Sequence, residues 1–189
     1  MNFNGFNKHN ELRDKHAFLS ASKYHWLNYD IQKLIDTYMN AVAAARGTEL
    51  HDWACRTIKL RKKQVSNKDT INMYINDAIT YGMTPEQVLF YSRNCFGTAD
   101  AISFRKNLLR IHDLKTGVTP ASMEQLKIYA ALFCLEYFIK PADISFELRI
   151  YQLNEVSVEK PEPAEIEQIM QTIMTFDKEI EKIRAEEEG

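Results

Sequence analysis

The order strand, apolar helix, strand in the middle of the chain constrains the fold more than any other feature of the sequence. Residues 108–115 are rich in strand-forming side chains, and residues 144–156 alternate hydrophobic and polar positions. Between them, Pro120 begins an apolar helix that runs to about Ile139. Two strands that are connected through a helix lie in one sheet as a parallel or near-parallel pair. The sequence therefore predicts an α/β fold.

Further elements complete this predicted sheet. Residues 96–105 form a strand joined to 108–115 by a short hairpin turn, and residues 87–94 form another strand before it. We expect a small mixed sheet of about four strands with helices on its faces. A short helix is predicted to begin near Ser20. Four longer helices are predicted over residues 30–46, 48–63, 69–81 and 164–184, and Gly47 separates the first two of these four.

Three segments are predicted along the chain. Residues 1–18 form a flexible N-terminal segment, because they are polar and lack hydrophobic periodicity. Residues 19–158 form one globular domain, and residues 159–189 form a linker followed by an amphipathic C-terminal helix. The apolar stripe of that helix packs either on its own domain or against a partner, such as a second copy of the chain.

Composition excludes several classes of protein. With 45% hydrophobic and 26% charged residues among 189, the chain has enough apolar material for a core. The longest apolar stretch, residues 129–139, is too short to span a membrane. The polar first ten residues do not resemble a secretion signal. Because three scattered cysteines cannot form a disulfide framework, we expect a protein of the reducing cytoplasm.

Charge is unevenly distributed. The net charge is −2, and residues 162–189 carry nine acidic and three basic side chains, so the rest of the chain is left with +4. A mildly basic body is compatible with binding a phosphate backbone, although acidic helical tails are common in proteins of many functions.

Three charged residues on neighbouring strands form the strongest candidate site. Asp113 and Lys115 are two residues apart on one strand, so they share a face, and the hairpin brings Asp100 beside them. Carboxylate oxygens suit a divalent cation such as Mg²⁺, and a lysine can position a water or stabilise charge on a phosphate. An isolated Asp-x-Lys is usually a surface salt bridge. A charge pair in the middle of an α/β sheet, however, needs a partner or a metal.

Two other features fit the same chemistry. His51 lies one helical turn after Gly47, and histidine is a common ligand for Mn²⁺-like ions. Gln125 and Tyr129 are four residues apart on the helix between the strands, so they share a face from which they could bind a phosphate or hold Lys115. Taken alone, each feature is more typical of ordinary packing: a capping or core histidine for His51, and boundary packing for Gln125 and Tyr129.

Together these motifs resemble the PD-(D/E)XK nuclease superfamily. Gly47-x-x-x-His51, Gly97-x-x-Asp100, Asp113-x-Lys115 and Gln125-Leu-x-x-Tyr129 occur in the order of that superfamily's αβββαβ core. Within it, the chain is similar to the branch that contains the RecB nuclease domain, the CRISPR-associated RecB-like nucleases and, more distantly, phage lambda exonuclease. The resemblance covers about residues 19–157, and implies a restriction-endonuclease-like fold and a stand-alone nuclease of a phage or mobile element.

The resemblance also implies roles for individual residues. His51, Asp100, Asp113 and the backbone carbonyl of Leu114 would bind Mg²⁺ or Mn²⁺. Lys115 would be the catalytic lysine, and Gln125 and Tyr129 would support it. Because no cysteine follows Cys134, the iron–sulfur cluster found in many members of this branch is expected to be absent.

The implied function is hydrolysis of DNA phosphodiester bonds, with an exonuclease that acts on DNA ends as the first expectation. The expected partner is therefore a DNA end or a single DNA strand, and the C-terminal helix could add a second copy or a recombination protein. The alternative is a catalytically silent member of the same fold that binds DNA or a protein. A third interpretation, an unrelated α/β domain with chance motifs, requires that His51, Asp100, Asp113 and Lys115 lie apart.

Overall fold

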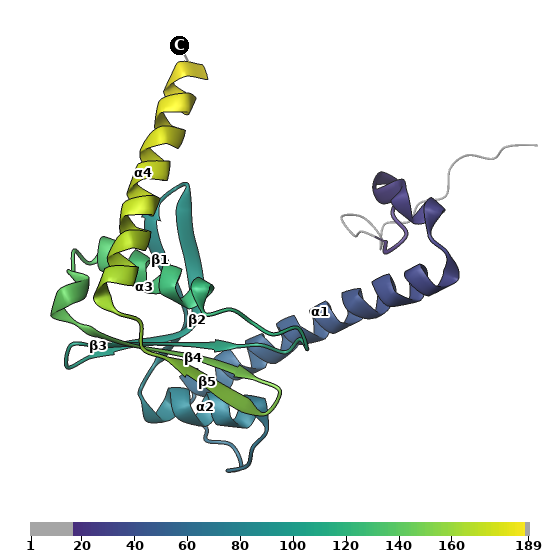
Figure 1. The fold of residues 1–189 in the computed structure, drawn as a ribbon. Coiled ribbons are helices and arrows are strands. Elements are labelled where there is room, and N and C mark those ends of the chain that lie inside the picture. The colour runs from purple at the N-terminus through teal and green to yellow at the C-terminus, as the bar shows by residue number, and fades with distance from the viewer. Residues whose placement is uncertain (1–16, 188–189) are drawn as a thin grey trace, which may run out of the picture. The chain divides into compact units, whose positions relative to one another are not determined.

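A computed structural model describes residues 17–187, and most of the segment predicted to be flexible lies outside them. Contacts divide the chain into two compact units, residues 1–46 and 47–189. The first unit contains the 3₁₀ segment η2 (Ala21–Asn28) and the start of helix α1 (Ile31–Lys59). The second contains the end of α1 and every other element (Figure 1). The predicted segment boundaries after residues 18 and 158 stay predictions.

Helix α1 is continuous through Gly47, so the predicted interruption there is wrong. A single glycine costs about 1 kcal/mol in a helix interior. The residues directly before Gly47, three alanines and an arginine at positions 43–46, are strong helix formers, and they continue the helix through the glycine. Gly47 is buried because it faces the loop that follows the third strand. The residue therefore allows a close approach between two segments without ending the helix.

The sheet has five strands in the order β1-β2-β3-β4-β5. Strands β3 and β4 are parallel and the other neighbours are antiparallel, so the predicted parallel pair is confirmed and the sheet is mixed. The bounds are β1 Thr84–Ser92, β2 Cys95–Arg105, β3 Leu108–Leu114, β4 Ser145–Gln152 and β5 Glu155–Glu159.

The prediction of one strand over residues 144–156 is wrong, because this segment turns back on itself. Leu153 and Asn154 both have left-handed backbone angles, with φ of 50° and 61°, and they connect β4 to β5. Two consecutive residues of this conformation form the type I′ turn of a tight hairpin. The turn between β2 and β3 has the same form at Lys106 and Asn107, where φ is 52° and 57°.

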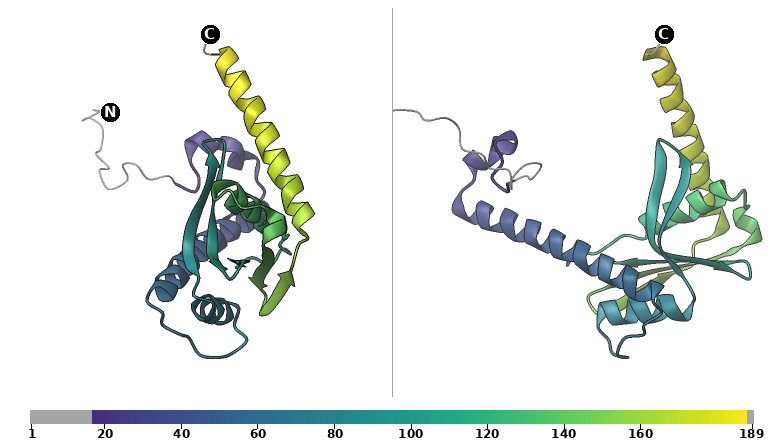
Figure 2. Two further views of the ribbon diagram at one scale, coloured as in Figure 1. Left: turned by 90° about the vertical axis from the view of Figure 1, so that its left-hand side faces the viewer. Right: turned by 180° about the vertical axis from the view of Figure 1, so that it is seen from behind.

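Helices cover both faces of the sheet (Figures 1 and 2). Helix α2 (Thr70–Thr80) confirms the helix predicted over residues 69–81, and it packs with the end of α1 on one face of the sheet. Helix α3 (Glu124–Glu136), which connects β3 to β4, packs on the other face. It begins four residues after Pro120, so the predicted start is wrong. The side chain of Gln152 donates to the carbonyls of Gly117 and Thr119 and thereby holds this segment in a loop.

The core consists of two layers, one on each face of the sheet. The layer under α3 includes Leu109, Ile111 and Leu148, which are fully buried. The layer under α1 and α2 includes Ile75 and Tyr151, which are also fully buried. None of the helices in the described part of the chain is long and apolar enough to cross a bilayer.

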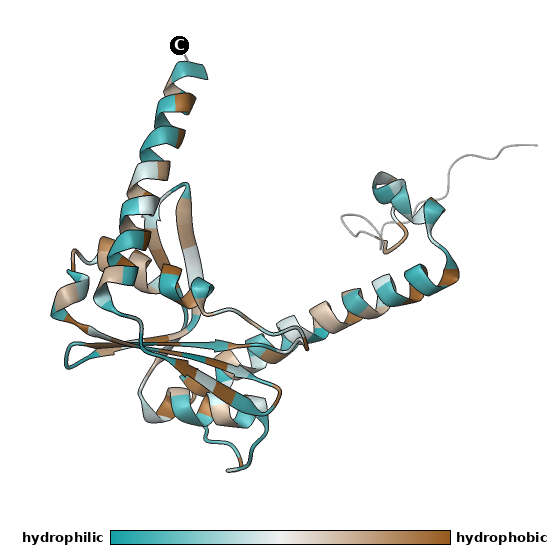
Figure 3. Ribbon diagram, in the orientation of Figure 1, coloured by the Kyte–Doolittle hydropathy of each residue, from teal (hydrophilic) through white to brown (hydrophobic). Residues whose placement is uncertain are grey.

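Helix α4 (Pro163–Glu187) uses only its first half for packing. Ile166 is fully buried, and Ile169, Met170 and Ile173 contact the core beneath α3. Farther along the helix Phe176 and other apolar residues are exposed. Figure 3 shows the alternation of hydrophilic and hydrophobic positions along this helix. Intrachain packing, one of the two predicted alternatives, therefore accounts for the first half of α4.

Candidate metal centre

Three acidic residues form a row across neighbouring strands of the sheet. The pairs Pro85↔Ala101 and Gln87↔Ala99 place Glu86 of β1 opposite Asp100 of β2. The pair Ala101↔His112 likewise makes Asp113 the next residue of β3 opposite Asp100. Like charges that face each other on adjacent strands are destabilising. A row of carboxylates in this position therefore requires compensation.

His51 completes a potential metal site with two of these acids. One ligand atom from each of His51, Glu86 and Asp100 lies within 4.8 Å of the other two. The Nδ1 atom of His51 is 3.5 Å from Oδ2 of Asp100, which also accepts a hydrogen bond of 2.8 Å from the backbone amide of Leu114. These residues come from α1, β1 and β2, so the fold and not the sequence spacing brings them together.

Glu86 was not predicted from the sequence. It has a φ of 52°, a left-handed conformation that is uncommon for a residue other than glycine. Residues held in such conformations cluster at functional sites. Only the register of β1 against β2 puts Glu86 beside Asp100, and no motif in the sequence contains that information.

The predicted Asp113, Lys115, Gln125 and Tyr129 form a chain of hydrogen bonds beside this cluster. The Lys115 ammonium donates to Oδ1 of Asp113 at 3.1 Å and to Oε1 of Gln125 at 2.9 Å. The Gln125 amide donates in turn to the Tyr129 hydroxyl at 2.9 Å. Asp113 and Lys115 thus share a face as predicted, and α3 supplies the two supporting side chains. The roles assigned to all four stay predictions.

One oxygen of Asp113 is left without a hydrogen bond. The residue is buried, with 2% of its surface exposed. Its Oδ2 lies 3.0 Å from the Lys115 nitrogen but lacks the geometry of a hydrogen bond. Buried polar atoms are nearly always satisfied, so an open lone pair on a buried carboxylate needs an explanation. The ion pair with the Lys115 ammonium supplies one, because it compensates the charge of this oxygen without a hydrogen bond.

Two glycines of the sequence motifs permit close approaches around the site. A Cβ atom at Gly47 would lie 2.7 Å from the Thr116 hydroxyl, in the loop directly after Lys115. A Cβ atom at Gly97 would lie 2.9 Å from the ring of Tyr129. Both distances are too short for an ordinary contact. The glycines therefore let α1 approach the loop after β3, and let the ring of Tyr129 approach the backbone of β2.

The pKa of Asp100 reflects its burial and the carboxylate beside it. Burial, and secondarily the negative charge of Asp113, raises the pKa of Asp100 to about 6, although the Leu114 amide and His51 favour its charged form. Burial also raises the pKa of Tyr129, so this residue stays a neutral hydrogen-bonding group. The charged form of Asp100 is thus disfavoured in the folded protein, and a bound cation would reverse that preference.

The donor set and its dimensions fit a Mn²⁺ or Mg²⁺ ion. An octahedral ion with ligands at about 2.1 Å holds neighbouring ligand atoms about 3 Å apart and opposite ones about 4.2 Å apart. The ligand atoms of His51, Glu86 and Asp100 lie within 4.8 Å of one another, and those of His51 and Asp100 are 3.5 Å apart, so these atoms would move closer together around a bound ion. Of the predicted ligands, His51 and Asp100 belong to this group of three. Asp113 lies outside it and pairs with Lys115, and a role for the Leu114 carbonyl stays a prediction.

A second polar cluster lies on the face of the sheet that α2 covers, and it was also missed. The Tyr151 hydroxyl donates to Asp77 at 2.7 Å and lies 3.2 Å from Nδ1 of the fully buried His112. Arg149 donates to Asp77 and to the Tyr81 hydroxyl, each at 3.0 Å. Burial, helped by two nearby arginines, lowers the pKa of His112 to about 3. The histidine is therefore a neutral core residue.

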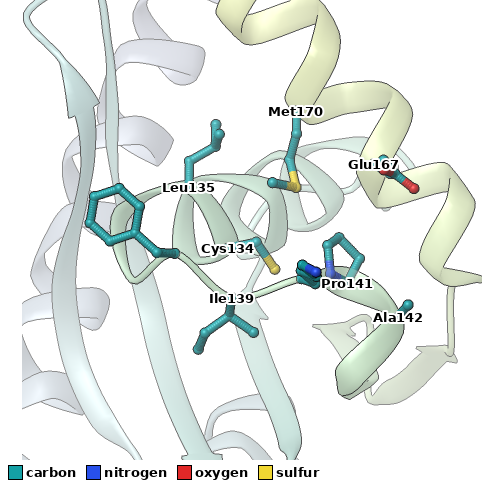
Figure 4. Close-up of a pocket in the computed structure, with 9 residues that line it drawn as sticks. Cys134, Leu135, Ile139, Pro141, Ala142, Glu167 and Met170 are labelled. Atoms are coloured by element: carbon teal, nitrogen blue, oxygen red, sulfur yellow. The ribbon is translucent and has the colours of Figure 1, made fainter.

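A pocket of about 390 Å³ lies away from the candidate metal centre, between the end of α3 and helix α4 (Figure 4). Cys134, Pro141 and Met170 are among the residues that line it. Burial raises the pKa of the Cys134 thiol to about 12, so this thiol is not a nucleophile at neutral pH. The pocket contains none of the predicted site residues.

Comparison with models of protein families, with curated proteins and with solved structures finds no match to this chain.

Proposed function

We propose that this protein is a Mg²⁺- or Mn²⁺-dependent nuclease that hydrolyses DNA phosphodiester bonds. The observation that supports the proposal most strongly is a convergence. Lys115 is held by Asp113 and Gln125 directly beside the His51–Glu86–Asp100 cluster. Residues that are up to 74 positions apart along the chain, from His51 to Gln125, meet at one end of the sheet. If the motifs had arisen by chance in an unrelated domain, these residues would not be expected to lie close together.

Each group then has a chemical task. A bound divalent ion lowers the pKa of a coordinated water and neutralises charge that develops on the phosphate. His51, Glu86 and Asp100 would hold that ion. The Lys115 ammonium would donate a hydrogen bond to the attacking water or to a phosphate oxygen, and Asp113 and Gln125 fix its position. Through its hydrogen bond with Gln125, Tyr129 limits the orientations open to that amide.

The topology supports the same proposal. The second unit contains the end of α1, helix α2, three antiparallel strands, helix α3 and a strand parallel to the third, and this order is compatible with the αβββαβ core of the restriction-endonuclease-like fold. Strand β5 and helix α4 are additions at the C-terminal end of this order. The four motif pairs lie on α1, on β2, at the end of β3 and on α3. Exonuclease action on DNA ends is the specific form we propose.

Cleavage of end-labelled DNA tests the proposal. Linear and covalently closed DNA, single- and double-stranded, are incubated with Mg²⁺, Mn²⁺ or EDTA. We expect loss of linear DNA that requires metal and is absent in Lys115→Ala and Glu86→Gln. Lys178→Ala, which removes an exposed lysine of α4, is the matched control and should cleave as the wild type does.

The outcomes separate the alternatives. Cleavage of closed circles would identify an endonuclease. If the wild type cleaves no DNA with either metal, or if Lys115→Ala retains full cleavage while folded, the proposed active site is wrong. In the first of these cases the silent, binding member of the fold becomes the better interpretation.

A further inference from the structure

The outer face of the β1–β2 hairpin carries a group of exposed apolar side chains, which we call the hairpin platform: Val88, Phe90 and Phe96. Their exposed fractions are 50%, 47% and 63%. Phe90 is paired directly with Phe96, and Val88 is two residues before Phe90 on the same face. Exposed apolar patches of this kind mark binding surfaces.

The opposite face of the hairpin is already occupied. Leu89 is buried there, and Gly97 lies against Tyr129 of α3. The platform therefore faces away from α3, toward the side of the sheet from which α1 supplies His51. Its side chains have no role in the core, so burial within the unit does not explain them.

We propose that the hairpin platform stacks the unpaired bases of a single DNA strand that leads to the His51–Glu86–Asp100 cluster. This inference rests on the proposed nuclease function and specifies its substrate. The rings of Phe90 and Phe96 are stacked, with centroids 6.4 Å apart and planes inclined by 29°. Flat exposed rings bind any base through its π face, and they do so independently of sequence.

The position of the platform favours a strand of DNA over other ligands. Phe90 is four residues from Glu86 along β1, and Phe96 is four residues from Asp100 along β2. At the rise of a strand, each ring is about 13 Å from the cluster, the length of a few nucleotides. Both strands of the hairpin thus lead from the rings to the metal ligands.

Charge along the hairpin is compatible with a phosphate backbone. Between Glu86 and Asp100, residues 87–99 include no acidic side chain and one basic side chain, Arg93, which is exposed at the tip. The nearest acids from α4, Asp177 and Glu181, are engaged by hydrogen bonds from Asn94 at 2.9 and 2.6 Å. A strand on the platform therefore meets no free carboxylate of the hairpin before it reaches the cluster.

The hairpin is also held in place, which lowers the entropic cost of binding. Arg184 of α4 donates to the Asn94 side chain at 2.7 Å, so the tip is braced. On the edge strand β1, the backbone amide of Phe90 donates to Glu136 of α3 at 2.9 Å. Because this edge amide is occupied, a partner protein cannot pair with β1 at the platform through that group. At the platform, the hairpin can therefore bind a ligand through the rings of Phe90 and Phe96 and not through the backbone amide of Phe90.

Binding in EDTA tests the inference without cleavage. Fluorescence anisotropy measures the affinity of the full chain for a labelled oligothymidylate of about 20 nucleotides, for the same backbone with abasic sites, and for a blunt duplex. The test variant is Phe90→Leu/Phe96→Leu, which keeps apolar surface but removes the rings. Phe138→Leu is the control, since Phe138 is 94% exposed and lies outside the hairpin. Melting curves verify that each variant is folded.

We expect the wild type and the control to prefer the oligothymidylate over the abasic strand and the duplex. The double leucine variant should bind the oligothymidylate at least about tenfold more weakly, with unchanged binding of duplex. Phe90→Trp/Phe96→Trp should restore the preference. Equal binding by the leucine variant and the wild type would overturn the inference.

Two further results separate this inference from its alternatives. If sedimentation shows that the wild type is a dimer and the leucine variant a monomer, the platform is an interface between copies, and the inference is wrong. If the wild type binds single strands through the platform but cleaves no DNA with Mg²⁺ or Mn²⁺, the inference stands and the proposed nuclease function falls.

Discussion

Neutralising Asp100 should stabilise the metal-free protein. Burial and Asp113 raise the pKa of Asp100 to about 6, whereas the free side chain has a value of 3.8. Because one pKa unit corresponds to about 1.4 kcal/mol, the ionised carboxylate weakens the fold by up to about 3 kcal/mol at pH 8. Asp100→Asn removes that charge and keeps an oxygen that can accept from the Leu114 amide. We expect the melting temperature to rise by about 3–10 °C in EDTA.

The pH dependence of this gain has a definite sign. The pKa of Asp100 is higher in the folded chain than in the unfolded chain, so its proton stabilises the fold below about pH 4. That stabilisation is lost as pH rises through 6. The difference in unfolding free energy between Asp100→Asn and the wild type should therefore be large at pH 8 and close to zero at pH 4.

Metal should reverse the ranking of the two proteins. A ligand at one thousand times its dissociation constant stabilises a folded protein by about 4.1 kcal/mol, which exceeds the cost of about 3 kcal/mol from the ionised Asp100 carboxylate. Calorimetry with increasing Mn²⁺ should thus raise the melting temperature of the wild type and leave Asp100→Asn unchanged. Asp143→Asn, which neutralises an exposed acid near the start of β4, should match the wild type throughout. A lower melting temperature of Asp100→Asn in EDTA, or a retained response to Mn²⁺, would refute the reasoning.

Three other predictions follow from packing and burial. Gly47→Ala should destabilise the protein through its contact with Thr116, and in a Thr116→Ala background it should instead stabilise it by up to about 1 kcal/mol, as urea unfolding can show. Burial lowers the pKa of His112 to about 3, so between about pH 6.5 and 3 only the unfolded chain binds a proton at this residue. As pH decreases over that range, the unfolding free energy of the wild type should fall by about 1.4 kcal/mol per pH unit relative to that of His112→Gln. Parallel curves of unfolding free energy against pH for the two proteins would contradict this. Cys134 should resist iodoacetamide at pH 8 until urea unfolds the chain, and rapid native labelling by mass spectrometry would disprove its burial.

Local patterns predicted the elements that depend on local physics. The parallel pairing of β3 and β4 followed from one apolar helix between two strands, and the structure confirms it. The errors arose where tertiary contacts override the local signal. Gly47 is typical of a helix end, but its neighbours are strong helix formers and its small size is used for packing. The turn at Leu153 and Asn154 contains no glycine, the residue that usually indicates a type I′ turn in a sequence, so the β4–β5 hairpin was not evident.

The candidate site was predictable to the extent that its residues lie within motifs. Asp113 and Lys115 share a face because they are two residues apart, and Gln125 and Tyr129 because they are four apart on a helix. Glu86 has no such spacing, since it joins the cluster through the register of an edge strand. The order of the strands, and therefore the position of that edge, is a property of the whole sheet.

The two polar clusters of the sheet show why only one of them needs a ligand. On the α2 face, Arg149 is bonded to Asp77, and Arg110 lies 2.9 Å from Glu147, so positive and negative groups balance. At the other cluster, the Lys115 ammonium lies 3.0 Å from Asp113, and the carboxylates of Glu86 and Asp100 lie beside His51. Three carboxylates and one ammonium leave two uncompensated negative charges. Asp113 is buried and Asp100 partly buried, whereas Glu86 is exposed. Because buried charges are costly unless they are paired, one divalent cation is the smallest addition that balances this cluster.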